Sequence, residues 1–160
     1  MRGTALGAML LLAGGCGLTP VEVELVFPRE ENFLYSEFGQ LLVYDVSPEE
    51  RLGDCSTRLI EVESTGVGSP ILSTQRRPIC EFRDGGIRFP DIPAGPHAYV
   101  MLAYDDADSL LLSGCTIAEA YEGAPDVTVR LFPTAGYARA TQGRTLTCGN
   151  VTQKCATGCR

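Results

Sequence analysis

Hydrophobic and polar residues alternate along several stretches of the chain with the period of a β-strand. Over residues 21–27, apolar side chains fill every second position and glutamates separate the first three of them, which predicts a strand with one face in water. A similar alternation predicts a strand over residues 127–132, closed by Pro133. Residues 40–46 and 97–105 are apolar on both faces and predict central strands. Both faces of these two strands must be covered by the opposing sheet, by a helix or by a partner protein.

Turn-forming residues divide the second half of the chain into short segments. Asp84-Gly85-Gly86 predicts a turn that leads into a short strand over residues 87–89. Residues 90–96 (PDIPAGP) predict a rigid loop, because proline fixes φ and glycine tolerates positive φ. Residues 105–109 (DDADS) predict the turn of a hairpin whose second strand returns antiparallel over residues 110–112.

One helix is expected, from Pro48 to about residue 63. Ser47 is a favourable N-cap, Pro48 suits the first turn, and the two glutamates that follow suit the positive end of the helix dipole. The apolar positions that recur at helical spacing are Leu52, Cys55, Leu59 and Val62. Residues 60–63 also alternate as a strand would, so that alternative stays open.

These elements predict a mainly β protein built as an antiparallel β-sandwich with a short helix. Short strands separated by frequent turns favour two packed antiparallel layers. Residues 21–160 have the length of a single domain, and residues 148–160 form its cysteine-rich tail.

The first fifteen residues predict a secretory signal peptide. Arg2 is the only charged residue before Glu22, and residues 5–13 (ALGAMLLLA) are apolar. This apolar run has the length of the core of a signal peptide and is too short to span a membrane. We therefore expect residues 1–15 to be an export leader.

The segment A-G-G-C that ends at Cys16 resembles the lipobox of bacterial lipoprotein precursors. The resemblance implies cleavage before Cys16, a diacylglycerol group on its sulfur and an acylated amine, with residues 16–20 as a lipidated tether. Several acyl chains make a membrane anchor that hardly dissociates. A glycine after the cysteine, here Gly17, resembles the pattern of lipoproteins that are sorted to the outer membrane. The resemblance does not indicate whether the domain lies on the periplasmic side or on the cell surface. The alternative is an ordinary cleaved signal with an incidental cysteine.

Six cysteines remain when Cys16 is set aside, an even number that predicts three disulfides in an oxidising compartment. They are Cys55, Cys80, Cys115, Cys148, Cys155 and Cys159. The connectivity does not follow from the sequence; we expect Cys55 to pair with Cys80, and the remaining pairs to tie the tail to itself and to Cys115. A zinc site is the competing interpretation, but the cysteine spacing and the single histidine, His97, disfavour it.

A proline-glycine loop followed by a long strand and a hairpin, IPAGPHAYVML within residues 89–132, resembles the last strands of prealbumin-like modules such as carboxypeptidase regulatory-like domains. The resemblance implies a β-sandwich that acts as a binding or spacer element and carries no catalytic residues. The six-cysteine pattern departs from those modules.

The charge balance argues against nucleic acid as a partner. The chain has 13 basic and 20 acidic residues and a net charge of −7, and its basic residues are scattered, with Arg76 and Arg77 the only adjacent pair. Nucleic acid and anionic lipid surfaces both require clustered Lys and Arg.

No catalytic motif is present in the sequence, and we expect neither an enzyme nor a metal or cofactor. His97 lacks a matching Ser or Cys constellation, so a place at a strand end explains it better than a general base does. The segment with three aspartates does not contain the glycine and the distal glutamate of a calcium-binding loop, and it fits a solvated hairpin tip. The three residues are Asp105, Asp106 and Asp108.

These observations favour a lipid-anchored envelope protein that acts as a structural or protein-interaction module. Its partner would be another envelope protein, and its membrane contact would pass through the lipid. Tyr99 and Met101 are the expected partner contacts, provided that nothing within the molecule covers them. The alternative is a β-sandwich lipoprotein that binds a small ligand or a carbohydrate, which requires a concave pocket with converging polar groups.

Overall fold

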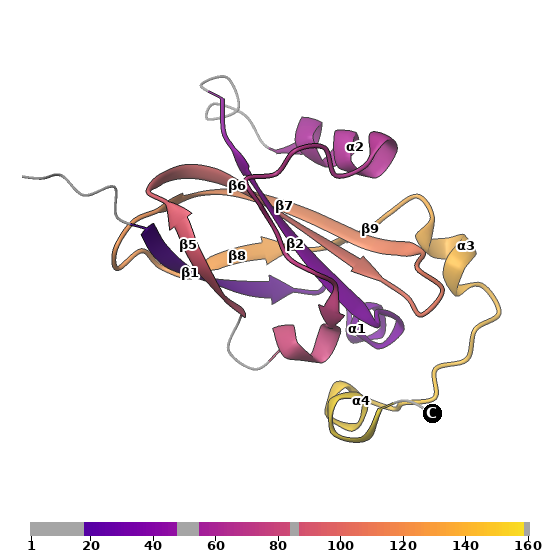
Figure 1. Cartoon of the computed structure of the whole chain (residues 1–160). Helices are drawn as coiled ribbons and strands as arrows, with labels where there is room; N and C mark the ends of the chain where they lie inside the picture. Colours follow the sequence, from indigo (N-terminus) through magenta and orange to yellow (C-terminus); the bar gives the residue numbers. More distant parts are fainter. Residues whose placement is uncertain (1–17, 48–54, 84–86, 159–160) are drawn as a thin grey trace, which may run out of the picture.

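Two β-sheets form the centre of the protein, for which a computed structural model describes residues 18–47, 55–83 and 87–158 (Figure 1). The smaller sheet has three strands in the order β5-β1-β8: β1 (Leu18–Val26), β5 (Ile87–Pro93) and β8 (Val127–Arg130). The larger sheet has six strands, in the order β3-β2-β6-β7-β9 with β4 paired to β2. These are β2 (Phe38–Asp45), β3 (Leu72–Ser73), β4 (Arg77–Pro78), β6 (Gly95–Tyr104), β7 (Leu110–Ala120) and β9 (Phe132–Pro133).

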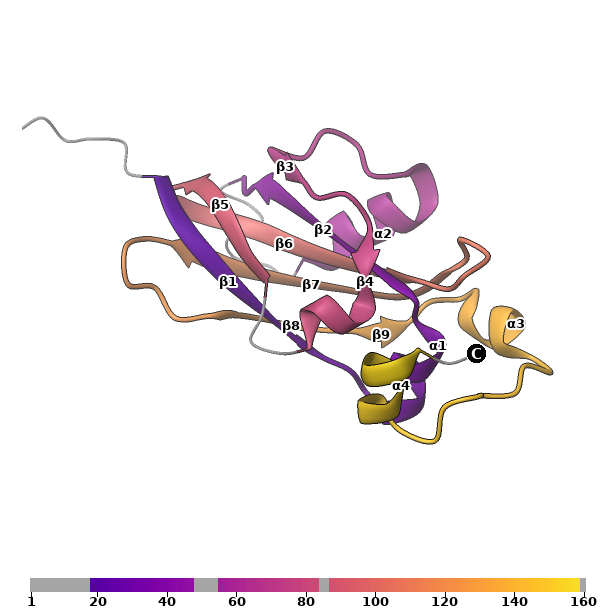
Figure 2. The same ribbon diagram turned by 60° about the horizontal axis from the view of Figure 1, so that its bottom comes forward.

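Short helices cover one face and one end of this sandwich (Figure 2). They are α1 (Glu30–Tyr35), α2 (Ser56–Thr65), the 3₁₀ helix η2 (Ile79–Phe82), α3 (Tyr137–Thr141) and α4 (Val151–Thr157). Helix α2 lies on the larger sheet, whereas α1, η2, α3 and α4 gather at the end where β1 finishes. No described helix is long and apolar enough to cross a membrane.

The strand pairing confirms the expected mainly β, antiparallel architecture, with one exception. β1 pairs with β8 in parallel, from Val23 opposite Val127 onward. The chain then passes from the smaller to the larger sheet at Leu131, whose N–H donates to Val26 O at 2.9 Å, and Phe132 pairs with Ser113 of β7. Strands β8 and β9 therefore join the two sheets along one side.

Several strands extend beyond the boundaries predicted from the sequence. β1 begins at Leu18, and its register shifts between Thr19 and Val21, so Pro20 lies at an irregular position where a missing N–H costs no ladder hydrogen bond. The tether expected over residues 16–20 is wrong for its last three residues, because Leu18–Pro20 belong to β1, and residues 16–17 lie outside the described part of the chain. The loop expected over residues 90–96 is wrong at both ends, since β5 continues to Pro93 and β6 begins at Gly95, which leaves Ala94 between them. The second strand of the hairpin, expected over residues 110–112, continues to Ala120 as β7.

The core between the two sheets contains the residues that we expected to contact a partner. Tyr99 and Met101 of β6 are each 0% exposed and pack in this core against apolar side chains of both sheets. The expectation of a partner surface at these residues is therefore wrong. The smaller sheet covers the face of β6 that carries Tyr99, Met101 and Ala103, as side chains of this kind require.

A second core lies on the other face of the larger sheet, under α2. Leu42, Val100 and Leu102 point to this side and pack against Val62 of α2. The expected helix is confirmed from Ser56 to Thr65, the strand alternative is wrong, and residues 48–54 lie outside the described part of the chain. Both faces of β6 are thus covered within the molecule.

Candidate functional site

The C-terminal tail folds back onto the end of the sandwich that contains α1. We call the part of the molecule formed by α1, η2, α3 and α4 the α1 end. The side chain of Asn150 caps α4 by accepting a hydrogen bond from Gln153 N at 2.8 Å. The carboxylate of Glu30 in α1 accepts a second one from Val151 N at 3.1 Å. Both contacts satisfy amide groups that the first turn of a helix leaves without an intrahelical partner.

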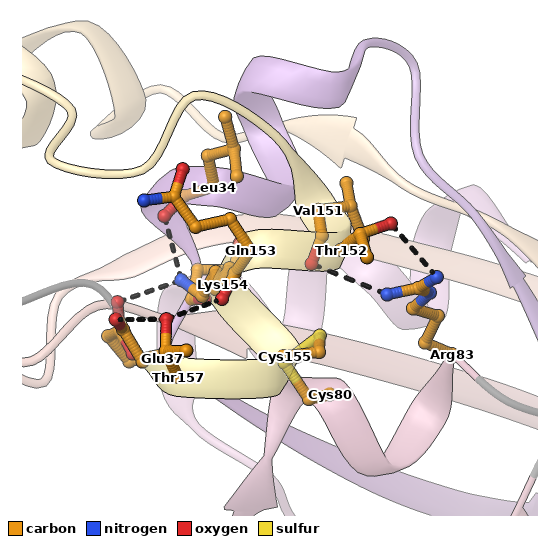
Figure 3. Close-up of a disulfide and its surroundings, with 12 residues drawn as sticks. Leu34, Glu37, Cys80, Arg83, Val151, Thr152, Gln153, Lys154, Cys155 and Thr157 are labelled. Carbon is orange, nitrogen blue, oxygen red and sulfur yellow. Dashed lines mark hydrogen bonds and ion pairs between the residues drawn. A yellow bond between two sulfur atoms is a disulfide. The ribbon is translucent and has the colours of Figure 1, made fainter.

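Lys154 holds α4 against α1 through a buried ammonium group (Figure 3). Its Nζ donates to Leu34 O and Ser36 O, each at 2.7 Å, and to Glu37 Oε1 at 2.8 Å. The two carbonyls lie at the C-terminal end of α1, where helical carbonyls lack partners and a cation is favoured. One side chain thereby satisfies the end of one helix and fixes the position of another.

One disulfide joins η2 to α4 at the α1 end, another joins the start of α2 to β7, and this pairing differs from the expected one. Cys80 of η2 bonds to Cys155 of α4, with a Cα–Cα distance of 5.4 Å (Figure 3). Cys55 at the start of α2 bonds to Cys115 of β7, so the predicted Cys55–Cys80 bridge is wrong. Cys148 is also disulfide-bonded. Because α2 packs on the larger sheet, Cys55 lies next to β7 and away from η2. Cys55 therefore bonds to Cys115 and not to Cys80.

Three hollows lie around α1. The first, of about 270 Å³, is lined by Glu24, Leu25, Phe27, Arg29, Glu30, Phe33, Phe82, Arg83 and Val151. The second, of about 200 Å³, is lined by Leu34, Tyr35, Glu37, Asp106, Arg144, Thr145, Leu146 and Thr147. The third, of about 380 Å³, is lined by Pro28, Arg29, Glu31, Asn32, Pro133 and Tyr137. The first has an apolar lining of three phenylalanines and Leu25 bordered by charged residues of both signs; we call it the phenylalanine groove.

An arginine ties the tip of the β6–β7 hairpin to the α1 end. Asp105 is buried, and Arg144 contacts its Oδ2 at 2.8 Å and Asp106 Oδ1 at 2.7 Å. Asp108 pairs with Arg76. Each of the three aspartates is thus engaged by an arginine, and the described residues contain no cluster of His, Cys, Asp and Glu suited to a metal ion.

His97 is buried at the start of β6, at the opposite end of the sandwich. Its Nε2 lies 2.7 Å from Pro93 O, and its Nδ1 lies 3.5 Å from Asp45 Oδ1 on the neighbouring strand. A backbone carbonyl and a carboxylate of the neighbouring strand are thus the groups beside its ring, which fits a residue that stabilises the start of a strand.

The sequence reasoning missed the α1 end. The sequence pattern predicts no element over residues 28–39 and no helix over the residues of α4. A signal was present for α4, because Asn150 followed three residues later by Gln153 is close to the capping-box pattern. Cys16, the predicted lipidation site, and Cys159 lie outside the described residues.

Comparison of the chain with protein-family models, with curated proteins and with solved structures finds no match.

Proposed function

We propose that the protein is a lipid-anchored module of the bacterial outer membrane that works by binding another envelope protein, without catalysis. The lipobox-like segment ending at Cys16 supports the anchor, and the apolar leader before it supports export. The disulfide-bonded cysteines fit an oxidising compartment.

The position of the hollows is the observation that carries the interaction part of this proposal. All three border α1, at the opposite end of β1 from Leu18, the first described residue after Cys16. A partner can reach the α1 end without displacing the anchor. The Cys80–Cys155 disulfide and Lys154 hold this end in one conformation, which lowers the entropy cost of binding.

The phenylalanine groove is the best candidate for the partner contact. Aromatic side chains at the centre of a contact with charged residues around them are the usual arrangement of a protein interface. The partner would insert apolar side chains between Phe27 and Phe82 and place polar groups near Arg29 and Glu24.

Site-specific crosslinking in the native envelope tests this proposal. A photoreactive amino acid at Glu24, an exposed residue of the groove, should give an adduct with one envelope protein. The matched control is the same amino acid at Ile60, which is 65% exposed on α2 and far from the groove. Equal adducts from both positions, or none from Glu24, would contradict the proposal.

Small-ligand binding is a second candidate, favoured by the hollow between α1 and α3. Glu31, Asn32 and Tyr137 converge there, and burial together with the Glu31 charge raises the pKa of Tyr137. If a sugar or small polar molecule binds this hollow, it should raise the melting temperature of the wild type, and Tyr137→Phe should reduce that rise. A panel of envelope sugars that leaves the melting temperature unchanged would remove this candidate.

A further inference from the structure

We propose that the end of the sandwich opposite α1 rests on the surface of a zwitterionic bilayer and that the α1 end points away from it. We call this surface the β1 end; it comprises the first residue of β1, the β5–β6 turn at residues 93–95 and residues 119–126. The inference rests on the proposed lipid at Cys16 and adds to it the orientation of the domain.

Few residues separate Cys16 from the first strand. Leu18 follows Cys16 by two residues, so their Cα atoms are at most about 7 Å apart. Leu18 and Thr19 already pair with Pro93 and Ile92 of β5. A lipid on Cys16 therefore holds the folded body, and not a long flexible linker, next to the membrane.

The elements beside Leu18 form the surface that would meet the lipid. Pro93 and Ala94 are exposed in the turn between β5 and β6, and Gly95 pairs with Ala120 at the end of β7. Tyr121 follows directly and is 49% exposed. Tyrosine is favoured in the headgroup region of membranes because its ring is apolar and its hydroxyl is polar. Figure 2 shows that β1 and β5 meet at this end, away from α1, α3 and α4.

The charges of the β1 end favour a zwitterionic surface. Glu119, Glu122 and Asp126 are exposed, and residues 114–129 contain no Lys or Arg. Anionic headgroups would repel these carboxylates, whereas a zwitterionic surface carries no net charge to repel them.

The length of β1 then determines how far the α1 end lies from the bilayer. β1 has nine residues, which span about 30 Å when extended. α1 begins at Glu30, four residues after β1 ends at Val26. The phenylalanine groove would therefore stand far enough from the bilayer to be open to a second protein.

Tryptophan fluorescence in vesicles tests this orientation, because the chain contains no tryptophan. The lipidated protein is reconstituted in phosphatidylcholine vesicles with brominated acyl chains, which quench only tryptophan near the bilayer. Tyr121→Trp should lose fluorescence relative to vesicles without bromine. The matched control, Phe132→Trp, is 58% exposed on β9 near the α1 end and should keep its fluorescence. Replacing part of the lipid by phosphatidylglycerol should weaken the quenching of Tyr121→Trp.

The outcomes separate this inference from the proposed function. If intact mass shows lipid on Cys16 but Phe132→Trp is quenched as strongly as Tyr121→Trp, the orientation is overturned and the anchor stands. Stronger quenching with phosphatidylglycerol overturns the zwitterionic surface. A mass without lipid overturns the proposed anchor and the orientation together. If either variant misfolds, Glu122→Trp and Ala135→Trp, two exposed positions at the same two ends, replace the pair.

Discussion

Tyr99 carries a hydroxyl that the folded protein buries without a hydrogen-bond partner among the described residues. Burial of a polar group without a partner costs free energy. Tyr99→Phe keeps the ring in the core and removes that cost. We expect it to raise the free energy of unfolding at pH 7 by about 1 kcal/mol, measured by urea denaturation.

The same substitution should change the pH dependence of stability. Burial raises the pKa of Tyr99 from its ordinary value of 10.0 to about 12. The folded state therefore favours the neutral phenol, and the stability present below pH 10 is lost as the pH rises toward 12. Between pH 9 and pH 11 the wild type should lose about 1 kcal/mol more than Tyr99→Phe. Equal losses would show that the hydroxyl reaches water.

Lys154 satisfies two backbone carbonyls and one carboxylate at once. Lys154→Met would leave the buried carbonyls of Leu34 and Ser36 with no donor and the more exposed Glu37 carboxylate without its ion pair, so we expect a loss of about 3 kcal/mol in the free energy of unfolding. The control is Arg139→Met, which removes one positive charge from an exposed position of α3 and should change stability little. Similar losses in both variants would mean that net charge, not the buried contact, explains the effect.

At the scale of the elements, the close approach of β7 to β8 depends on Gly114. A Cβ atom at this position would lie 2.2 Å from the backbone oxygen of Arg130, far inside van der Waals contact. Gly114→Ala should therefore push the two strands apart and lower the melting temperature strongly or prevent folding. Gly136→Ala, whose Cβ would meet nothing closer than 3.7 Å, should be tolerated.

The Cys80–Cys155 disulfide joins η2 and α4 across 75 residues of sequence. The double variant Cys80→Ser, Cys155→Ser should lower the free energy of unfolding by about 2 to 5 kcal/mol. Hydrogen exchange should rise first in α4 and η2 and not in α2, which the Cys55–Cys115 disulfide still holds. An equal rise in α2 would contradict the assignment of each disulfide to its own part of the fold.

The long elements could be predicted from the sequence because their apolar residues stand at the positions whose side chains are buried. β1, β2 and β6 follow from alternation or from continuous apolar residues, and α2 follows in part from helical spacing. α1 could not, because it is less than two turns long and is held by a distant contact, that of Lys154 with Leu34. For α4 the sequence offers only the capping residues Asn150 and Gln153, because the helix is held in place by the distant bond of Cys155 to Cys80. Pro90 favours a loop in the sequence pattern, although a short strand at the edge of a sheet also accommodates proline, as in β5.

At the scale of the whole molecule, the sandwich and the use of disulfides were predictable, whereas the disulfide pairing and the proposed contact surface at the α1 end were not. Pairing depends on which strands become neighbours, and periodicity does not encode that. The apolar side chains of β6 illustrate the limit: the pattern at Tyr99 and Met101 showed that both faces are covered, but not that the covering sheet belongs to the same chain.

We propose a covalent state in which Cys16 carries lipid and the other six cysteines are bonded in pairs, and the remaining proposals depend on this state. Intact mass of the protein from native membranes, measured without reductant and after treatment with a thiol alkylator, tests it most directly. We predict a chain that begins at Cys16, carries the mass of a diacylglycerol and an acyl group, and gains nothing from the alkylator. A chain that retains residues 1–15 and is alkylated at its cysteines would contradict the account.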